Sequence, residues 1–176
     1  PYIFSSPLSS MLTHKRRTEH SAILVGRRTA LLDNPSLTSR HWFGKSPVRL
    51  VIDKDLTLPK KLVLFNGEVQ TIVFTRKDEA SCLPQTTYVT LDFEQAILPQ
   101  IMEELYKRKL QSLMVEGGSK LLQSFIDAGL WDEAYIEKSD ALLEEGVKAP
   151  CFPKNYRTLT EKKMGKEFKF MKNQPV

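Results

Sequence analysis

Short continuous runs of apolar residues place the strongest constraint on how this chain can fold. Residues 22–26, Ala-Ile-Leu-Val-Gly, form such a run, and residues 48–53 and 71–75 repeat the pattern. Strands buried on both faces of a parallel sheet have this composition, whereas half-exposed strands alternate apolar and polar residues. Connecting sequence rather than a two-residue hairpin turn follows each run. We therefore expect a mostly parallel sheet.

Helical periodicity occurs between and beside these strands. The pair Ser6-Pro7 is typical of a helix start, and the apolar residues after it recur at helical spacing toward His20. Further elements are expected as a helix at 94–109, a strand at 112–115, a helix at 119–129 and strands at 132–137 and 167–171. The last strand alternates in polarity, which favours an antiparallel position near the sheet edge. The fold class is α/β, with helices flanking the sheet.

Length and composition narrow the class of protein. With 176 residues and 41% hydrophobic content, the chain is expected to form one domain over residues 1–176. The net charge of +5 is scattered along the chain, which suits small anionic ligands at least as well as nucleic acid. Cys82 and Cys151 lack the spacing of a disulfide framework or a zinc site, and a reducing cytoplasm fits them. No run approaches the length of about 20 apolar residues that a membrane span requires.

The segment from Val25 to Arg40 is the most informative stretch for function. It places many hydrogen-bonding side chains in a loop at the carboxyl end of a buried strand, where open α/β sheets bind ligands. The alternative is that Asp33-Asn34-Pro35 is only a turn and that Arg40 is a solvated charge. Spacing alone does not decide between the two interpretations.

A second candidate lies where the strand at 112–115 runs into Glu116-Gly117-Gly118-Ser119. Glycines allow a phosphate close to the backbone, and the helix N-terminus after them favours an anion, although a plain tight turn is also open. Glu116 could accept hydrogen bonds from the N–H groups of a heterocycle. The three histidines are not spaced as metal ligands, so no metal site is expected, and each is interpreted as a surface residue: His14, His20 and His41.

Taken together, three motifs resemble the riboflavin-pathway pyrimidine reductases. They are Val-Gly-x-x-Thr-x-x-x-Asp-x-Pro-x-Leu-Thr-x-Arg at residues 25–40, Pro-Val-Arg-Leu-Val-Ile-Asp at 47–53 and Val-Glu-Gly-Gly at 115–118. The resemblance runs from about Ile3 to Pro150. It implies a dihydrofolate-reductase-like fold with an antiparallel C-terminal element. The implied activity is NADPH-dependent reduction of the ribose of 5-amino-6-(5-phosphoribosylamino)uracil.

The resemblance also implies site residues. The cofactor NADPH would contact Ile3, Thr29, Asp33, Lys54, Gly118, Ser119, Lys120, Leu121, Leu122, Gln123 and Ser124. The phosphorylated pyrimidine substrate would contact Arg17, Leu37, Arg40 and Glu116, with the two arginines clamping its 5′-phosphate. No catalytic acid is assigned, because hydride transfer to an opened ribosylamine depends chiefly on positioning. Family members are commonly dimeric, so a homodimer is implied.

The chain departs from the family pattern at its start. Members carry a strand ending in a Ser-x-Asp-Gly-like loop before the first helix, and Pro1-Tyr2-Ile3 begins after that point. We expect the chain to be a fragment that lacks its first strand. In a bifunctional member of the family, the whole protein would also carry an N-terminal deaminase domain. A non-catalytic domain of this fold and a basic nucleic-acid-binding module remain alternatives. A dihydrofolate reductase proper should carry a carboxylate in its first helix, and residues 6–18 contain none.

Overall fold

The computed structural model describes residues 6–138, 146–153, 156–163 and 166–175. The chain divides between Gly118 and Ser119 into two compact units, and each is described by itself. Whether both belong to one domain over residues 1–176 stays a prediction. Within the described residues, none of the helices has the length and apolar character needed to cross a bilayer. Ile3 lies outside the described residues.

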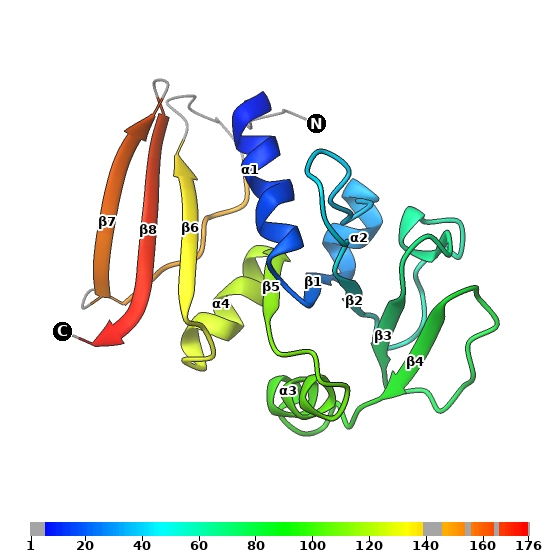
Figure 1. Cartoon of the computed structure of the whole chain (residues 1–176). Coiled ribbons are helices and arrows are strands. Elements are labelled where there is room, and N and C mark those ends of the chain that lie inside the picture. Colours follow the sequence, from blue (N-terminus) through cyan, green and yellow to red (C-terminus); the bar gives the residue numbers. More distant parts are fainter. Residues whose placement is uncertain (1–5, 139–145, 154–155, 164–165, 176) are drawn as a thin grey trace. The chain divides into compact units, whose positions relative to one another are not determined.

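The first unit is built on a five-stranded sheet in which every neighbouring pair is parallel (Figure 1). Its strands, in spatial order, are β4 (Thr86–Thr90), β3 (Thr71–Thr75), β2 (Val48–Ile52), β1 (Ala22–Gly26) and β5 (Leu113–Gly117). The expectation of a parallel sheet is confirmed. The three apolar runs form its centre, because strands with neighbours on both sides and cover on both faces bury nearly all of their side chains.

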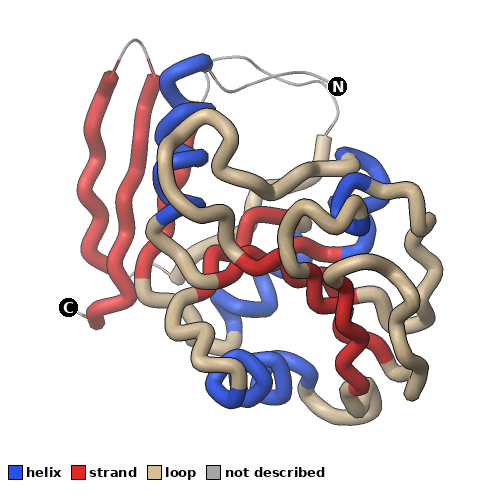
Figure 2. Tube along the Cα trace, turned by 45° about the vertical axis from the view of Figure 1, so that its right-hand side comes forward, coloured by secondary structure: helices blue, strands red, loops and turns tan. Residues whose placement is uncertain are grey.

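The helices expected in this unit are confirmed within a few residues. Helix α1 (Pro7–Thr18) begins as the sequence indicates, since the Ser6 hydroxyl accepts the backbone N–H of Ser9 and Pro7 occupies the first turn. Helix α3 (Ile97–Lys107) buries Leu98, Ile101 and Leu105 on one face. Loops fill much of the remaining chain between these short elements (Figure 2).

Helix α2 and strand β4 of this unit were not expected. Residues 27–33, interpreted as loop, form helix α2 (Arg27–Asp33), so that interpretation is wrong. The helix is too short to show a periodic apolar pattern, and Asn34 ends it in the left-handed conformation. Strand β4 was missed because it is an edge strand that is rich in partly exposed threonines and carries no apolar run.

Arg49 on β2 organises the loops around the sheet although it is completely buried. Its Nη1 donates to the carbonyl of Val63 at 2.9 Å, in the 3₁₀ turn η1 (Val63–Phe65). Its Nη2 donates to Asn66 Oδ1 at 3.1 Å and to the carbonyl of Val69 at 3.0 Å. Burial lowers the pKa of Arg49, and the nearby charge of Glu68 opposes that shift. Arg49 therefore holds these loop segments in place through hydrogen bonds and is not a solvated surface charge.

The second unit contains helix α4 (Ser119–Asp127) and a separate antiparallel sheet. Its strands, in spatial order, are β6 (Glu133–Lys138), β8 (Lys166–Pro175) and β7 (Tyr156–Lys163). The antiparallel C-terminal element is confirmed, but its expected position near the sheet edge is wrong for β8, which is the central strand of a separate sheet. Tyr135 and Phe170 pair across β6 and β8 with ring centroids 4.9 Å apart. Strand β7 was missed because Lys, Glu and Thr dominate it.

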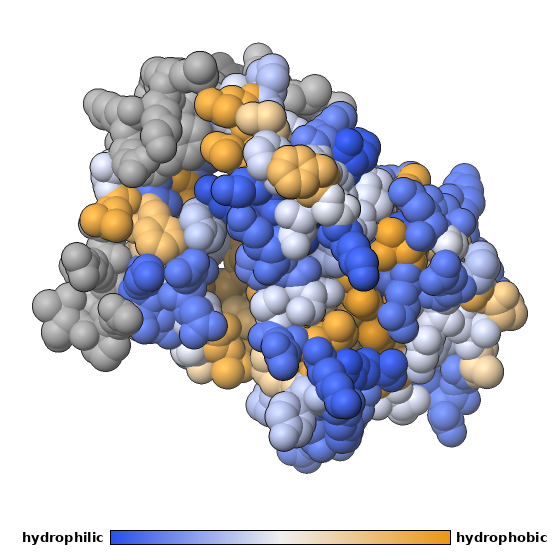
Figure 3. Space-filling view, in the orientation of Figure 1, coloured by the Kyte–Doolittle hydropathy of each residue, from blue (hydrophilic) through white to orange (hydrophobic). Residues whose placement is uncertain are grey.

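Among the described residues, exposed large hydrophobic side chains occur in several separate segments, and two of them, Tyr135 and Leu159, flank Phe170 in one row across the antiparallel sheet. The most exposed large ones include Phe43, Tyr106 and Val147, which belong to separate segments of the chain. In Figure 3 hydrophobic areas on the face drawn are interrupted by hydrophilic ones. Isolated exposures of this kind are ordinary on protein surfaces and do not by themselves mark a docking site.

Candidate functional site

The strand order creates one preferred place for a ligand in the first unit. From β1 the chain builds outward through β2, β3 and β4, and it then returns to place β5 on the other side of β1. Ligands of open α/β sheets bind at the carboxyl ends of the strands where the order reverses in this way. The reversal here lies between β1 and β5. The two candidate segments of the sequence follow these two strands.

A β-bulge sets the position of Glu116. Leu24 of β1 pairs with Val115 of β5, but the next residue, Val25, pairs with Gly117, so Glu116 is the extra residue. A bulge interrupts the alternation of side chains along a strand and redirects one of them. Glu116 is largely buried, with 17% of its side chain exposed, and it meets Arg17 near the end of α1.

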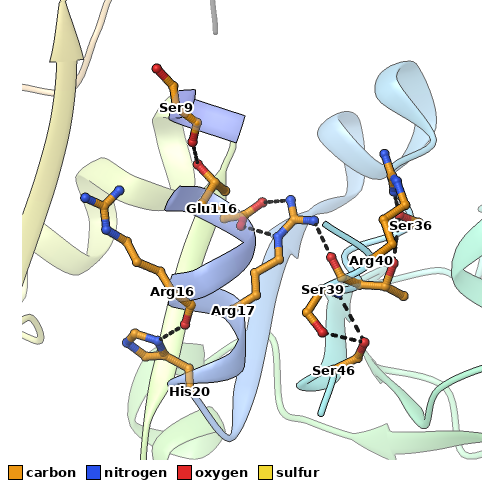
Figure 4. Close-up of polar contacts among 11 residues, drawn as sticks. Ser9, Arg16, Arg17, His20, Ser36, Ser39, Arg40, Ser46 and Glu116 are labelled. Carbon is orange, nitrogen blue, oxygen red and sulfur yellow. Dashed lines mark hydrogen bonds and ion pairs between the residues drawn. The ribbon is translucent and has the colours of Figure 1, made fainter. Parts of the chain in front are cut away.

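Arg17 and Glu116 form a two-pronged ion pair (Figure 4). Arg17 donates from Nε to Glu116 Oε1 at 2.6 Å and from Nη2 to Oε2 at 2.7 Å. Paired hydrogen bonds of this kind fix both position and orientation. The third nitrogen, Nη1, donates to the backbone carbonyl of Thr38 at 2.8 Å. Arg17 therefore joins α1, β5 and the loop at residues 34–47.

The same loop carries Arg40, whose exposed guanidinium is held at two points. Nη1 donates to the hydroxyl of Ser36, and Nε donates to His41 Nε2 at 3.2 Å. The hydroxyl of Thr38 donates to Ser36 Oγ at 3.3 Å, so both arginines are anchored to one short stretch of loop. The structure thus brings Arg17, Glu116 and the loop of Arg40 together, although the first two residues neutralise each other.

Leu37 has a different position from the one a ligand-contacting side chain would need. It is 1% exposed and belongs to the hydrophobic core, and its φ of 53° places its backbone in the left-handed region. Its side chain belongs to the buried hydrophobic cluster that also contains Ile23 and Val25, and it does not face solvent. A contact between Leu37 and a substrate would involve backbone atoms. The assignment of Leu37 to the substrate stays a prediction.

His14 was interpreted as a surface residue, and that interpretation is wrong. It is 4% exposed on α1, three residues before Arg17. Burial, followed by the charges of Arg17, His41 and Arg40, lowers the pKa of His14 to about 4, while the backbone of Thr38 acts in the opposite direction. Its Nδ1 has no hydrogen-bond partner, and its ring contacts that of His41 edge to face, with centroids 4.6 Å apart.

Thr29 and Asp33 lie four residues apart on α2, directly after β1. Residues at this spacing share one face of a helix. Within the described part of the chain, neither the Thr29 hydroxyl nor the Asp33 carboxylate has a hydrogen-bond partner or an ion-pair partner. A Cβ placed on Gly117 would lie 2.9 Å from Thr29 Cγ2, so the glycine allows α2 to approach the end of β5 closely. Gly118 follows with a φ of 87°.

Lys54 follows β2 at the same end of the sheet. Asp53, which is 2% exposed, accepts the backbone N–H of Leu58 at 2.8 Å and the Thr57 hydroxyl at 3.1 Å, and so fixes the turn after the strand. The carbonyl of Lys54 accepts hydrogen bonds from Thr75 and Arg76. Its ammonium lies 3.9 Å from Glu94 at the surface. A partly exposed cation at this edge is compatible with an anionic ligand.

The remaining cofactor residues predicted from the resemblance begin α4 in the second unit. Lys120 is exposed, while Ser119, Leu121 and Leu122 are half-buried. Gln123 is already engaged: its amide accepts the N–H of Cys151 at 2.8 Å and donates to the carbonyl of the same residue at 3.1 Å. Ser124 donates to the carbonyl of Leu121 within the helix. The first backbone N–H groups of an α-helix have no partner within the helix, so they can bind an anion.

Sequence reasoning missed the polar loop residues that organise this region, Ser36 and Thr38, and the pair formed by His14 and His41. Serine and threonine in a turn-rich segment give no signal that distinguishes an anchor from a solvated hydroxyl. One available signal was the spacing of His14 and Arg17, which places them on the same face of α1.

A parallel α/β sheet with polar and charged side chains gathered at the carboxyl ends of β1, β2 and β5 defines a ligand-binding domain of the open-sheet class. The sequence profile of the RibD C-terminal domain matches residues 4–137. The chain belongs to the RibD C-terminal domain family.

Relatives and solved structures agree with that assignment. The chain is 33% identical over 147 residues to the riboflavin biosynthesis protein RibD of Aquifex aeolicus, covering 81% of this chain and 41% of that protein. It is 34% identical over 128 residues to a 2,5-diamino-6-ribosylamino-4(3H)-pyrimidinone 5′-phosphate reductase of the same organism, covering 68% of this chain and 57% of the relative.

A solved structure extends the comparison to the fold. The crystal structure of a diaminohydroxyphosphoribosylaminopyrimidine deaminase/5-amino-6-(5-phosphoribosylamino)uracil reductase from Thermotoga maritima superposes with a TM-score of 0.78 at 30% identity. The match covers 93% of this chain and 47% of that one. The chain spans about two fifths of the length of the RibD proteins it matches first. The dihydrofolate-reductase-like fold expected from the resemblance is confirmed.

Proposed function

We propose that this chain catalyses the NADPH-dependent reduction of 5-amino-6-(5-phosphoribosylamino)uracil to its 5-phosphoribitylamino product, a step of riboflavin biosynthesis. The observation that carries the proposal is the placement of Glu116 by a bulge of β5, braced by Arg17, beside the loop that holds Arg40. Membership of a family whose relatives are named as pyrimidine reductases supplies the substrate class. The non-catalytic alternative and the nucleic-acid alternative gain no support from these comparisons.

Glu116 is the residue proposed to orient the pyrimidine. Its two carboxylate oxygens accept from Arg17, and each oxygen keeps a second lone pair for an N–H group of the heterocycle. The ion pair keeps the carboxylate in one position, so that little rotational freedom remains to be lost on binding. This arrangement gives Arg17 the task of bracing Glu116. The 5′-phosphate is then left chiefly to Arg40, whose Nη2 has no hydrogen-bond partner in the described residues.

The residues at the end of β1 fit a dinucleotide cofactor. Thr29 and Asp33 supply an uncommitted hydroxyl and an uncommitted carboxylate on one helix face, a set that suits ribose hydroxyls and carboxamide N–H groups. When bound, NADPH supplies the hydride. Lys54 and residues 118–124 are proposed to hold the phosphates and the adenosine side of NADPH. Ile3 is proposed to line the NADPH site.

The protein's own contribution is positioning. A ribosylamine that opens to an imine already has an electrophilic carbon, so bringing the two reacting atoms to within about 3–3.5 Å is the principal requirement. Glu116, Arg40 and Thr29 are assigned to orientation, and no residue is assigned as a proton donor. An attached deaminase domain is proposed from the name of the Thermotoga maritima deaminase/reductase, and a homodimer is proposed from the family resemblance alone. A reducing cytoplasm suits the two free, exposed cysteines.

Fluorescence titration with NADPH and, separately, NADH is the first test. Saturable NADPH binding, followed by loss of NADPH absorbance when the phosphorylated pyrimidine is added, is the expected result. The 2,5-diamino-pyrimidinone analogue, assayed beside the uracil, shows on which of the two pyrimidines the chain reduces the ribosyl group. Binding of neither dinucleotide would favour a non-catalytic domain, and steeply salt-dependent binding of DNA or RNA would favour a nucleic-acid module.

The role of Arg40 can be tested in the same assay. Arg40→Ala should raise the substrate KM about tenfold to a hundredfold, which corresponds to a lost charge-assisted contact of roughly 1.5–3 kcal/mol. The KM for NADPH should not change. An unchanged substrate KM would remove Arg40 from the substrate site.

A further inference from the structure

Arg40 is held in place before any ligand binds, and the atoms that hold it leave one edge of its guanidinium open. Nη1 donates to Ser36 Oγ (Figure 4). Nε donates to His41 Nε2, whereas Nη2 has no partner in the described residues. An exposed arginine normally samples many side-chain rotamers and loses that freedom on binding. Two fixed contacts reduce that loss.

The ring of His41 contacts the buried ring of another histidine. It contacts the ring of His14 edge to face, at an interplanar angle of 87° and a centroid distance of 4.6 Å. His14 is 4% exposed and belongs to α1, so the ring beneath His41 is fixed by the core of the first unit. His14 stays neutral because burial lowers its pKa to about 4. His14 therefore carries no positive charge that would repel Arg17 and Arg40.

The hydrogen bond from Arg40 also defines the state of His41. An imidazole nitrogen accepts a hydrogen bond only when it carries no proton, so Nε2 must be bare and the ring proton must lie on Nδ1. This tautomer is set by the guanidinium that donates to it. The three side chains thus form a chain of contacts that runs from the core of α1 to the exposed guanidinium.

We propose that His41 is a positioning residue that holds Arg40 ready for a phosphate ester, with the buried ring of His14 fixing the ring of His41. The inference rests on the proposed function, because it assigns a support to the residue that would bind the substrate's phosphate. It adds a determinant of substrate affinity that lies outside the motif at residues 25–40.

Steady-state kinetics with a double-mutant cycle tests the inference. His41→Ala should raise the KM of the phosphorylated pyrimidine about twofold to tenfold at unchanged kcat, a smaller effect than that of Arg40→Ala. Adding His41→Ala to Arg40→Ala should have no further effect, because His41 acts through Arg40. Lys45→Ala, an exposed cation in the same loop, is the control and should leave KM unchanged. An unchanged KM in His41→Ala, or a further rise in the double variant, would overturn the inference.

A measurement on the unliganded protein separates this inference from the proposed function. Nitrogen-15 NMR of the histidine rings should show the His41 proton on Nδ1 in the wild type and on Nε2 in Arg40→Ala. If the wild type shows no reductase turnover, the proposed function is lost, and the two NMR spectra still decide the inference. The same His41 tautomer in both proteins would contradict it.

Discussion

The ion pair between Arg17 and Glu116 should contribute measurably to the stability of the first unit, and Glu116→Gln is the substitution that tests it. The amide keeps the shape of the side chain but removes its charge. Only 11% of the Arg17 side chain and 17% of the Glu116 side chain are exposed. Arg17 would keep its bond to the Thr38 carbonyl at 2.8 Å, and one amide oxygen would remain to accept from it.

The size of the effect follows from burial. Opposite charges about 4 Å apart attract by about 4 kcal/mol at an effective dielectric constant of about 20, and the cost of desolvating both groups offsets much of this. Removing one partner of a fully buried pair costs about 3–5 kcal/mol, since the other charge stays behind. Some water reaches this pair. We therefore expect Glu116→Gln to lower the free energy of unfolding by about 2–3 kcal/mol and Tm by about 4–12 °C.

Urea unfolding followed by far-ultraviolet circular dichroism measures the effect in Glu116→Gln, Arg17→Met and the double variant. The double variant should lose less than the sum of the two single losses, with a coupling energy of about 2 kcal/mol. Glu19→Gln is the matched control, because it breaks an exposed 3.7 Å pair with Lys15 on the same helix and should cost less than about 0.5 kcal/mol. Additive single losses no larger than this control would refute the reasoning.

Three further substitutions test the structure. Gly117→Ala should destabilise the protein by about 1–3 kcal/mol, because its Cβ would lie 2.9 Å from Thr29 Cγ2; Thr29→Ser, which removes that methyl group, should recover part of the loss in thermal melts. Arg49→Met should cost about 3 kcal/mol in urea unfolding, since it leaves buried carbonyl groups without a donor. The pKa of His14 is lowered from 6.5 to about 4, so between these pH values the unfolded chain binds a proton that the folded chain does not. The free energy of unfolding should therefore fall by up to about 3 kcal/mol as the pH drops through that range. His14→Gln should make the free energy of unfolding less dependent on pH there.

A definite experimental result would contradict each of these three predictions. Equal melting temperatures for Gly117→Ala and the wild type would mean that α2 does not approach β5 as closely as described. A stable Arg49→Met variant would show that the loops are held by other contacts. If stability between pH 6.5 and 4 depends on pH equally in His14→Gln and the wild type, carboxylates rather than His14 control acid unfolding.

Local patterns were sufficient for much of the fold. The mainly apolar runs at residues 22–26, 48–53 and 71–75 became the central strands, because strands covered on both faces are built largely from apolar residues. The start of α1 and the glycine that ends α4 could also be predicted from the sequence, since capping depends on a few adjacent residues. Strands β4 and β7 were not, because polar strands gain their stability from partners distant in the sequence.

For the candidate site, the sequence by itself identified the types of residue and the family, and the contacts among those residues waited for the tertiary structure. Arg40 and Glu116 were recognisable from their motifs and Arg17 from its place at the end of the first helix, but nothing in their spacing showed that Arg17 binds Glu116 across 99 positions of sequence. Only the pairing of β1 with β5 and the bulge between them bring the two charges together. Burial of His14 was hidden for the same reason, because the exposure of a side chain depends on every element that packs over it.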